Sequence, residues 1–234
     1  MSNKIARSWW PDAAALAAFV ALTVALARGH LLDFDRRVAA WALTQHDSAG
    51  PVYWTARVFN YLGQGGSLLM PVTILLTGLL FWRTRSVRAV LPFAATFVLT
   101  YFTIGPAKIF FDRAAPRFEG PDPTMLFNPH ASGTLAMSYP SGHVANSIVW
   151  FGTIALLLSM LRGRDLSRRE WIPLRVLPVV IVFVTTVYTG FHWVTDSVAA
   201  LFLGLILTRL LARIPFASIP LPRAAQRWDR PAHR

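Results

Sequence analysis

The chain has 234 residues, of which 54% are hydrophobic and only 15% are charged. Soluble domains carry roughly 25% charged residues, so this composition argues against a soluble enzyme, and its apolar content excludes an intrinsically disordered chain. The chain contains no cysteine, which excludes disulfides, thiolate metal sites and cysteine nucleophiles. The net charge of +12 fits nucleic acid, anionic lipid headgroups or topology-setting loops, and the positions of the charges decide among them.

Six apolar stretches are each close to the length that a helix needs to cross the hydrocarbon core of a bilayer. They are residues 12–28, 67–82, 89–107, 143–161, 172–190 and 196–212. Helices are favoured there because a backbone in lipid must satisfy its own hydrogen bonds. The pattern predicts an all-α bundle of six transmembrane helices over residues 1–214, followed by a basic cytoplasmic tail over residues 215–234.

The first stretch shares some features with a cleavable signal peptide. Lys4 and Arg7 precede it, and Ala25–Ala27 has the small-x-small form of a cleavage site. However, residues 9–12 (Trp-Trp-Pro-Asp) make an unusual junction between the basic start and the apolar run, and five further spans follow. We therefore interpret the first stretch as a retained helix.

The basic residues predict the orientation of the bundle. With the N-terminus in the cytoplasm, 16 of the 23 basic residues lie in cytoplasmic segments and 7 lie on the other side. This distribution follows the positive-inside rule and predicts a multi-pass protein of a cell inner or plasma membrane with both termini cytoplasmic. It also accounts for the high charge without nucleic acid, for which the sequence has no basic helix or stacking platform.

Two long segments lie on the outer face in this topology. Residues 29–66 contain apolar positions near helical spacing with charges between them, which predicts an interfacial helix. Residues 108–142 are rich in proline, glycine and polar residues, and loops of this kind carry function more often than the elements that they connect.

Three polar clusters mark the ends of the predicted helices on this outer face. They are residues 108–117, 139–143 and 185–196. Polar groups at membrane depth are costly to bury and therefore indicate function. Their convergence on one face predicts an extracytoplasmic active site.

The sequence Pro140-Ser141-Gly142-His143 has the features of a helix start. Ser141 can cap the helix, whose free amides and positive dipole end favour an anion. Gly142 allows close approach of the backbone, and His143 could donate a proton into such a site. The alternative is an ordinary cap with a surface histidine.

His192 and Asp196 are four residues apart, so on a helix they share a face. A carboxylate there can hold an imidazole in one tautomer and leave its other nitrogen as a nucleophile or base. The alternative is a surface ion pair. We expect no metal and no cofactor, because a third strong zinc ligand is not spaced beside the two histidines and the nearby cations would repel a metal ion.

Lys108 lies at a helix end with Arg113 and Arg117 in the following loop. Together these cations form a basic rim suited to phosphate, since lysine charges and arginine forks both bind phosphate well. Alternatively, Lys108 is a snorkelling anchor at the membrane surface.

The three clusters together resemble the type 2 phosphatidic acid phosphatase (PAP2) superfamily of integral membrane lipid phosphatases. The family pattern is Lys-x6-Arg-Pro, Pro-Ser-Gly-His and Ser-Arg-x5-His-x3-Asp, and here it covers about residues 108–196. The resemblance implies a site that needs no metal, in which His192 becomes a phosphohistidine, Asp196 orients it and His143 protonates the leaving oxygen. It also implies phosphate binding by Lys108, Ser141 and Gly142.

Both arginines of the family pattern are replaced in this chain. Ala115 stands at the first position, and Thr186 at the second, with Thr185 in place of the serine. Loss of one such donor costs roughly 3 kcal/mol of transition-state stabilisation. Arg113 or Arg117 could reach in from the same loop, and Thr186 could donate one hydrogen bond.

The resemblance implies a membrane lipid phosphatase that hydrolyses a lipid phosphate or diphosphate of the polyprenyl or glycerolipid type. Two alternatives remain open at this stage. One is a lipid phosphotransferase, and the other is a catalytically impaired protein that binds or transports lipid phosphates. The expected partner is a membrane lipid substrate, and the sequence does not indicate the oligomeric state.

Overall fold

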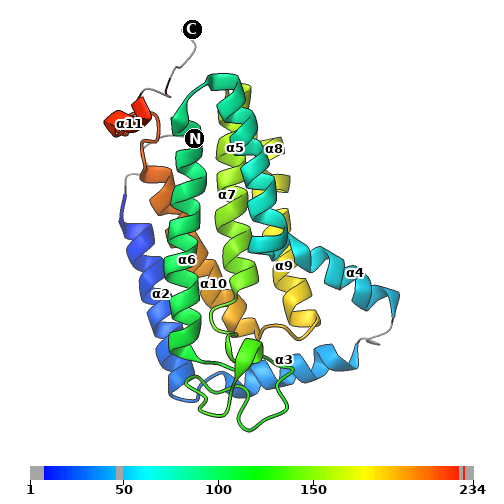
Figure 1. The fold of residues 1–234 in the computed structure, drawn as a ribbon. Helices are drawn as coiled ribbons and strands as arrows, with labels where there is room; N and C mark the ends of the chain where they lie inside the picture. The colour runs from blue at the N-terminus through cyan, green and yellow to red at the C-terminus, as the bar shows by residue number, and fades with distance from the viewer. Residues whose placement is uncertain (1–7, 46–49, 227–228, 230–234) are drawn as a thin grey trace.

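The computed structural model describes residues 8–45, 50–226 and 229, and these residues form an all-α structure without strands (Figure 1). Six helical segments are long and apolar enough to cross a membrane, which confirms the predicted six-helix bundle. The six segments are α2 (Trp10–Ala27), η2 with α5 (Gly65–Leu69 and Met70–Thr84), η3 with α6 (Val87–Val90 and Leu91–Phe111), α7 (Gly142–Arg162), α8 with α9 (Arg168–Arg175 and Leu177–Tyr188), and α10 (Val194–Arg213).

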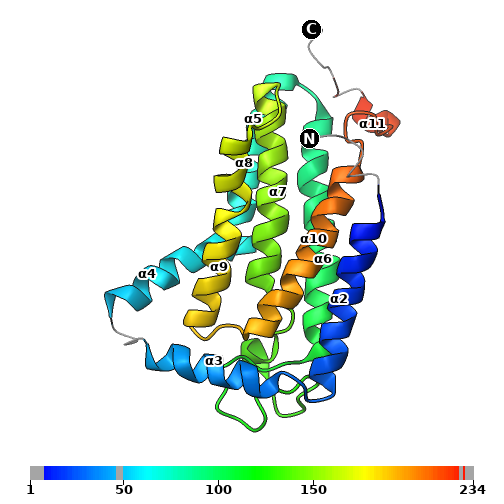
Figure 2. The same cartoon turned by 180° about the vertical axis from the view of Figure 1, so that it is seen from behind.

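Helix α7 is the centre of the bundle, with α9 and α10 packed against it on the side seen in Figure 2. More than half of its spanning window is buried, a larger share than in any other span. Its buried residues Val144 and Val149 share one core with Ala200 and Leu207 of α10. The two helices that carry the predicted histidine motifs are therefore held together by the main hydrophobic core.

The outward faces of the surrounding helices are also apolar. Leu75 of α5 is 72% exposed and Phe102 of α6 is 66% exposed. A helix that is hydrophobic on all sides belongs in a large core or a membrane. These faces are therefore suited to contact lipid.

The segment between α2 and α5 forms two further helices at one end of the bundle. Helix α3 (Leu32–Thr44) lies across this end, and α4 (Pro51–Asn60) leads through η1 (Tyr61–Gly63) back to the bundle (Figure 1). This confirms the helix predicted within residues 29–66. We call this end the site end; the opposite end is where α2 begins and α10 finishes.

Residues 112–141 close the same end as an ordered loop that contains η4 (Gly133–Ala136). The amide of Ala115 donates to Leu135 O at 2.8 Å, and the amide of Ser138 donates to Arg113 O at 2.9 Å. These hydrogen bonds fold the second half of the loop back on the first, so that Ser138 lies next to the end of α6.

The described part of the tail packs at the opposite end and includes α11 (Arg223–Gln226). Phe216 and Leu221 are buried, and the Asp229 carboxylate accepts a hydrogen bond from Ser86 Oγ at 2.6 Å and contacts Arg88. The remainder of the predicted tail, residues 227–228 and 230–234, lies outside the described residues.

Helices α7 and α10 approach closely at Gly204, where a Cβ atom would lie 2.7 Å from Ile148 Cδ1. We expect Gly204→Leu to overpack this contact and to lower the free energy of unfolding by about 1–3 kcal/mol. The measurement is thermal unfolding of the purified protein in detergent. The control is Gly78→Leu on α5, where a Cβ atom meets nothing within 4 Å; equal melting temperatures for the two variants would contradict the tight α7–α10 contact.

Candidate active site

Two imidazoles meet at the site end, one from each histidine motif. His143 is the second residue of α7, and His192 lies in the turn that precedes α10. His143 Nδ1 lies 3.1 Å from His192 Nε2, and the ring centroids are 5.3 Å apart. The structure thus joins two sequence clusters that are 49 residues apart.

The surroundings of His192 fix its tautomer. Its Nδ1 lies 2.9 Å from the carbonyl oxygen of Ser138, and a carbonyl can only accept a hydrogen bond. The proton of a neutral imidazole is therefore on Nδ1, and the lone pair is on Nε2, which faces His143. This lone pair makes Nε2 of His192 a nucleophile or base.

Asp196 supports His192 mainly through Ser138. The carboxylate lies 3.7 Å from His192 Nδ1, which is too far for a hydrogen bond. Instead, Ser138 Oγ donates to Asp196 Oδ2 at 2.5 Å and lies 3.2 Å from the imidazole Nδ1. Asp196 Oδ2 also accepts from the Trp193 amide at 2.9 Å, as an acidic residue in the first turn of a helix often does.

Sequence reasoning did not identify Ser138. A serine three residues before Ser141 carries no local signal, because its role depends on the folding of the loop. The pairing of Ser138 N with Arg113 O and the bond from Ser138 Oγ to Asp196 hold it beside the imidazole.

Arg113 lies beneath the imidazoles, fully buried, rather than in an open basic rim. Its Nη1 donates to Asp196 Oδ1 at 2.6 Å and to Thr195 Oγ1 at 2.8 Å. Its Nη2 donates to Asp35 Oδ2 at 2.7 Å, and its Nε donates to Thr124 O at 2.8 Å. All three guanidinium nitrogens are thus engaged within the protein, and two carboxylates neutralise the charge.

Asp35 is a second residue that the sequence did not single out. It lies on α3 among charged residues that resemble a solvated face, yet it is only 1% exposed. Its carboxylate accepts from the Thr195 amide at 3.1 Å, in addition to its pairing with Arg113. Asp35 therefore ties α3 to the first turn of α10.

Lys108, for which the sequence predicts a role in phosphate binding, lies against the beginning of α7. A Cβ atom at Gly142 would lie 2.9 Å from Lys108 Cε and 3.7 Å from its Nζ, so the glycine makes room for the lysine. Lys108 Nζ also donates to Met137 O. Ser141 Oγ caps α7 by accepting from the Val144 amide, while the Ser141 amide donates to Asp196 O at 3.0 Å.

The two positions that replace the family arginines are both buried. The amide of Ala115 holds the loop, as described above. Thr186 Oγ1 donates to Val182 O within its own helix at 2.7 Å, and the Thr186 carbonyl accepts from the Phe191 amide at 2.9 Å. Thr186 therefore shapes the turn before His192, and its hydroxyl hydrogen is used within α9.

Arg117 lies at the edge of the site with a second arginine that the sequence analysis did not select. Its guanidinium donates to Tyr53 Oη, and its Cζ lies 4.7 Å from the centroid of the Phe191 ring. Arg57 of α4 approaches the same ring at the same distance. The described residues contain no group of three histidine, cysteine, aspartate or glutamate side chains that could hold a metal ion.

The fold and the site define a multi-pass helical membrane protein with paired imidazoles at a helix N-terminus. The sequence profile of the PAP2 superfamily matches residues 89–220, which include Lys108, His143 and His192, and the chain belongs to this superfamily.

Two known proteins resemble the chain. An undecaprenyl-diphosphatase of Sulfolobus acidocaldarius is 34% identical over 135 residues, which are 58% of this chain and 57% of the relative's length. The crystal structure of a transmembrane PAP2-type phosphatidylglycerolphosphate phosphatase from Bacillus subtilis matches with a TM-score of 0.66 and 21% identity, over 88% of this chain and 95% of that one. The second likeness confirms the predicted fold.

Burial lowers the pKa of His192 below its usual range, although the charge of Asp196 and the Ser138 carbonyl oppose this shift. We expect His192 to be neutral at pH 7, with its proton on Nδ1, because its pKa lies below its usual range. The Asp196→Asn substitution removes an opposing charge and lowers the pKa further. Imidazole ¹⁵N chemical shifts of histidine-labelled protein report the tautomer of His192 and its pKa in the wild type and in Asp196→Asn. A protonated His192 at pH 7 in the wild type would contradict the expectation.

Proposed function

We propose that the protein hydrolyses a lipid phosphate or diphosphate of the polyprenyl or glycerolipid type through a phosphohistidine at His192. The observation that carries this proposal is the unprotonated Nε2 of His192, set by the Ser138 carbonyl and facing a second imidazole at 3.1 Å. Membership of the PAP2 superfamily and the diphosphatase relative support the reaction class.

The reaction requires the phosphoryl group to enter between the two imidazoles and to replace their mutual hydrogen bond. His192 Nε2 forms a bond to phosphorus while the bond from phosphorus to the lipid oxygen breaks. His143, protonated to the imidazolium form once the phosphate anion is bound, gives one proton to the departing oxygen and returns to its neutral form, as a general acid does. His143 then takes a proton from water, whose oxygen attacks phosphorus and releases inorganic phosphate and free His192.

The phosphate oxygens are held by Lys108 and by the beginning of α7. The amides of Gly142 and His143 belong to the first helical turn, which has no hydrogen-bond partner four residues earlier in the helix. Together with the helix dipole they favour an anion there. Ser141 contributes its capping hydroxyl rather than its amide, which is bonded to Asp196 O.

We assign Arg113 a positioning role in place of the phosphate-binding role expected from the sequence. Its guanidinium is fully buried between Asp35 and Asp196, and a phosphate could reach it only by displacing a carboxylate. Truncation of one partner in such a buried pair leaves an unpaired charge. Arg113 therefore holds the Asp196 carboxylate in position beside Ser138 and His192.

Purified protein should release phosphate from at least one lipid in a panel of polyprenyl phosphate, polyprenyl diphosphate, phosphatidate and phosphatidylglycerol phosphate. His192→Asn should lower the rate by about 10³-fold or more, because it removes the nucleophile. Rapid acid-free quenching with lipid that carries ³²P in its phosphate should trap an acid-labile label on the wild type but not on His192→Asn. The matched control is His130→Asn, since His130 is an exposed histidine of the loop at the same end.

The outcomes of this experiment separate the alternatives. Equal release by the wild type and His192→Asn would reject the nucleophile. Transfer of the label to a lipid alcohol rather than to water would identify a phosphotransferase. Lipid binding without release from any member of the panel would identify a catalytically impaired binding or transport protein.

We further propose that the site end faces away from the cytoplasm, in agreement with the distribution of basic residues. Because the chain has no cysteine, a single introduced thiol reports its own side of the membrane. Arg37→Cys on α3 should react with a membrane-impermeant maleimide in intact cells, and Asp165→Cys at the opposite end should react only after permeabilisation. Both positions are exposed; the reverse pattern would invert the topology.

A further inference from the structure

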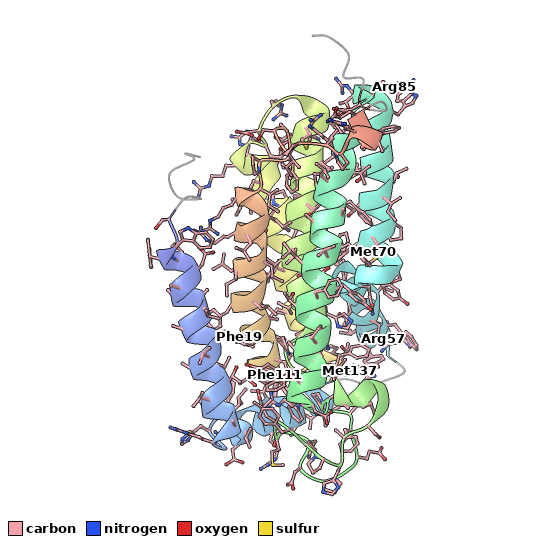
Figure 3. All side chains as sticks on the ribbon, turned by 60° about the vertical axis from the view of Figure 1, so that its left-hand side comes forward. Phe19, Arg57, Met70, Arg85, Phe111 and Met137 are labelled. Carbon is pink, nitrogen blue, oxygen red and sulfur yellow. The ribbon has the colours of Figure 1, made fainter. Side chains whose placement is uncertain are left out.

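Two arginines gather around the ring that stacks on His143. Arg57 Cζ and Arg117 Cζ each lie 4.7 Å from the centroid of the Phe191 ring. That ring lies 5.7 Å from the imidazole of His143 at an interplanar angle of 25°. Both cations therefore lie beside the proposed general acid, and Figure 3 shows Arg57 at the same end of the bundle as Met137 and Phe111.

Neither guanidinium is neutralised within the part of the chain that the structure describes. Arg117 donates to a neutral group, Tyr53 Oη, and Arg57 takes part in no hydrogen bond or ion pair with a described residue. Both are partly exposed, whereas Arg113 is buried between two carboxylates. Two like charges brought to one ring without a carboxylate between them favour an anion that bridges them.

The segment that carries Arg57 is held firmly against His143. Gln64 Nε2 lies 3.1 Å from His143 Nε2, and a Cβ atom at Gly63 would lie 2.8 Å from both His143 Cβ and its carbonyl oxygen. The short path from Arg57 to Gln64 therefore forms one wall of the site.

Arg117 is held against the turn that presents His192. A Cβ atom at Gly190 would lie 3.4 Å from both Cγ and Nε of Arg117. Gly190 has φ +69°, a conformation that favours glycine. Because glycine has no side chain, Arg117 can pack against the backbone two residues before His192.

We propose that Arg57 and Arg117 are substrate-binding residues that hold phosphate oxygens together with Lys108, in place of the arginines that Ala115 and Thr186 replace. Arginine guanidiniums bind phosphate through paired hydrogen bonds that a threonine or an alanine cannot supply. Arg57 lies outside residues 89–220, which match the family profile. This assignment rests on the proposed phosphatase function, and it concerns the residues that bind the phosphate.

The test is calorimetric titration of the full-length protein in detergent with inorganic phosphate at low salt. Arg57→Gln and Arg117→Gln should each weaken phosphate binding by about 10- to 100-fold, because each removes charged hydrogen bonds. Arg57→Lys should recover part of the loss, since it restores the charge without the fork. The control Arg37→Gln removes the same charge from exposed α3 and should bind phosphate as the wild type does.

A second measurement uses the lipid that the wild type hydrolyses. Both glutamine variants should lower kcat/KM by a similar factor, and Ala115→Arg should restore part of it in the Arg117→Gln background. Unchanged phosphate affinity in both glutamine variants, or an equal loss in Arg37→Gln, would overturn the assignment, provided that melting temperatures match. A wild type that binds phosphate through these arginines but releases none from any lipid would refute the phosphatase function and leave the binding site intact.

Discussion

The hydrogen bond between His192 Nδ1 and the Ser138 carbonyl is the constraint on which the rest of the site depends. It places the lone pair on Nε2, which the proposed attack on phosphorus requires. Ser138 is held there by its own amide, which donates to Arg113 O, and Arg113 is held by Asp35 and Asp196. One tautomer therefore depends on α3, on the loop after α6, and on the first turn of α10. These segments form no local unit, and only the closed end of the bundle brings them together.

The buried ion-pair network around Arg113 favours specificity over stability. Desolvation of a guanidinium and two carboxylates is costly, and such networks often contribute little net free energy of folding. Here each charge has several partners, including Thr195, which donates from both its amide and its hydroxyl to Asp35. These bonds tie together three segments: α3, the loop after α6 and the first turn of α10. Helix α3 thus has a structural role beyond its amphipathic outer face, because its Asp35 side chain bonds both Arg113 and the first turn of α10.

Local sequence rules sufficed to predict the spans from their apolar length and the Ser141 cap from the residues of a helix start. They also predicted that His143 and His192 lie on one side of the membrane, because successive spans end on alternate sides. They did not suffice for the partners of buried polar groups. Asp35 is 78 residues from Arg113, and its neighbours on α3 are the exposed pair Asp33 and Arg36. Spacing along one helix therefore gives no sign that Asp35 alone turns inward. For the same reason the sequence analysis assigned Arg113 to an open basic rim. A sequence gives the charge of a residue but not the ion-pair partners that the fold brings to it, here Asp35 and Asp196.

The residues around the two imidazoles come from more of the chain than the family motifs, two of whose arginines are replaced here. The charge needed to stabilise a phosphoryl group has to come from near the imidazoles, and among the proposed phosphate ligands Lys108 and Arg117 lie in the matched segment. The uncommitted cations nearest to His143 come from the loop after α6 and from α4, which precedes the matched residues. Gln64, which faces His143 Nε2, and Asp35 also precede them. A fragment limited to residues 89–220 would retain the family motifs but lack Gln64 beside His143, the Asp35 carboxylate that pairs with Arg113, and Arg57, which we propose as a phosphate ligand. Helix α3 and the segment that follows α4 therefore supply contacts to Arg113 and His143 that the family motifs do not contain.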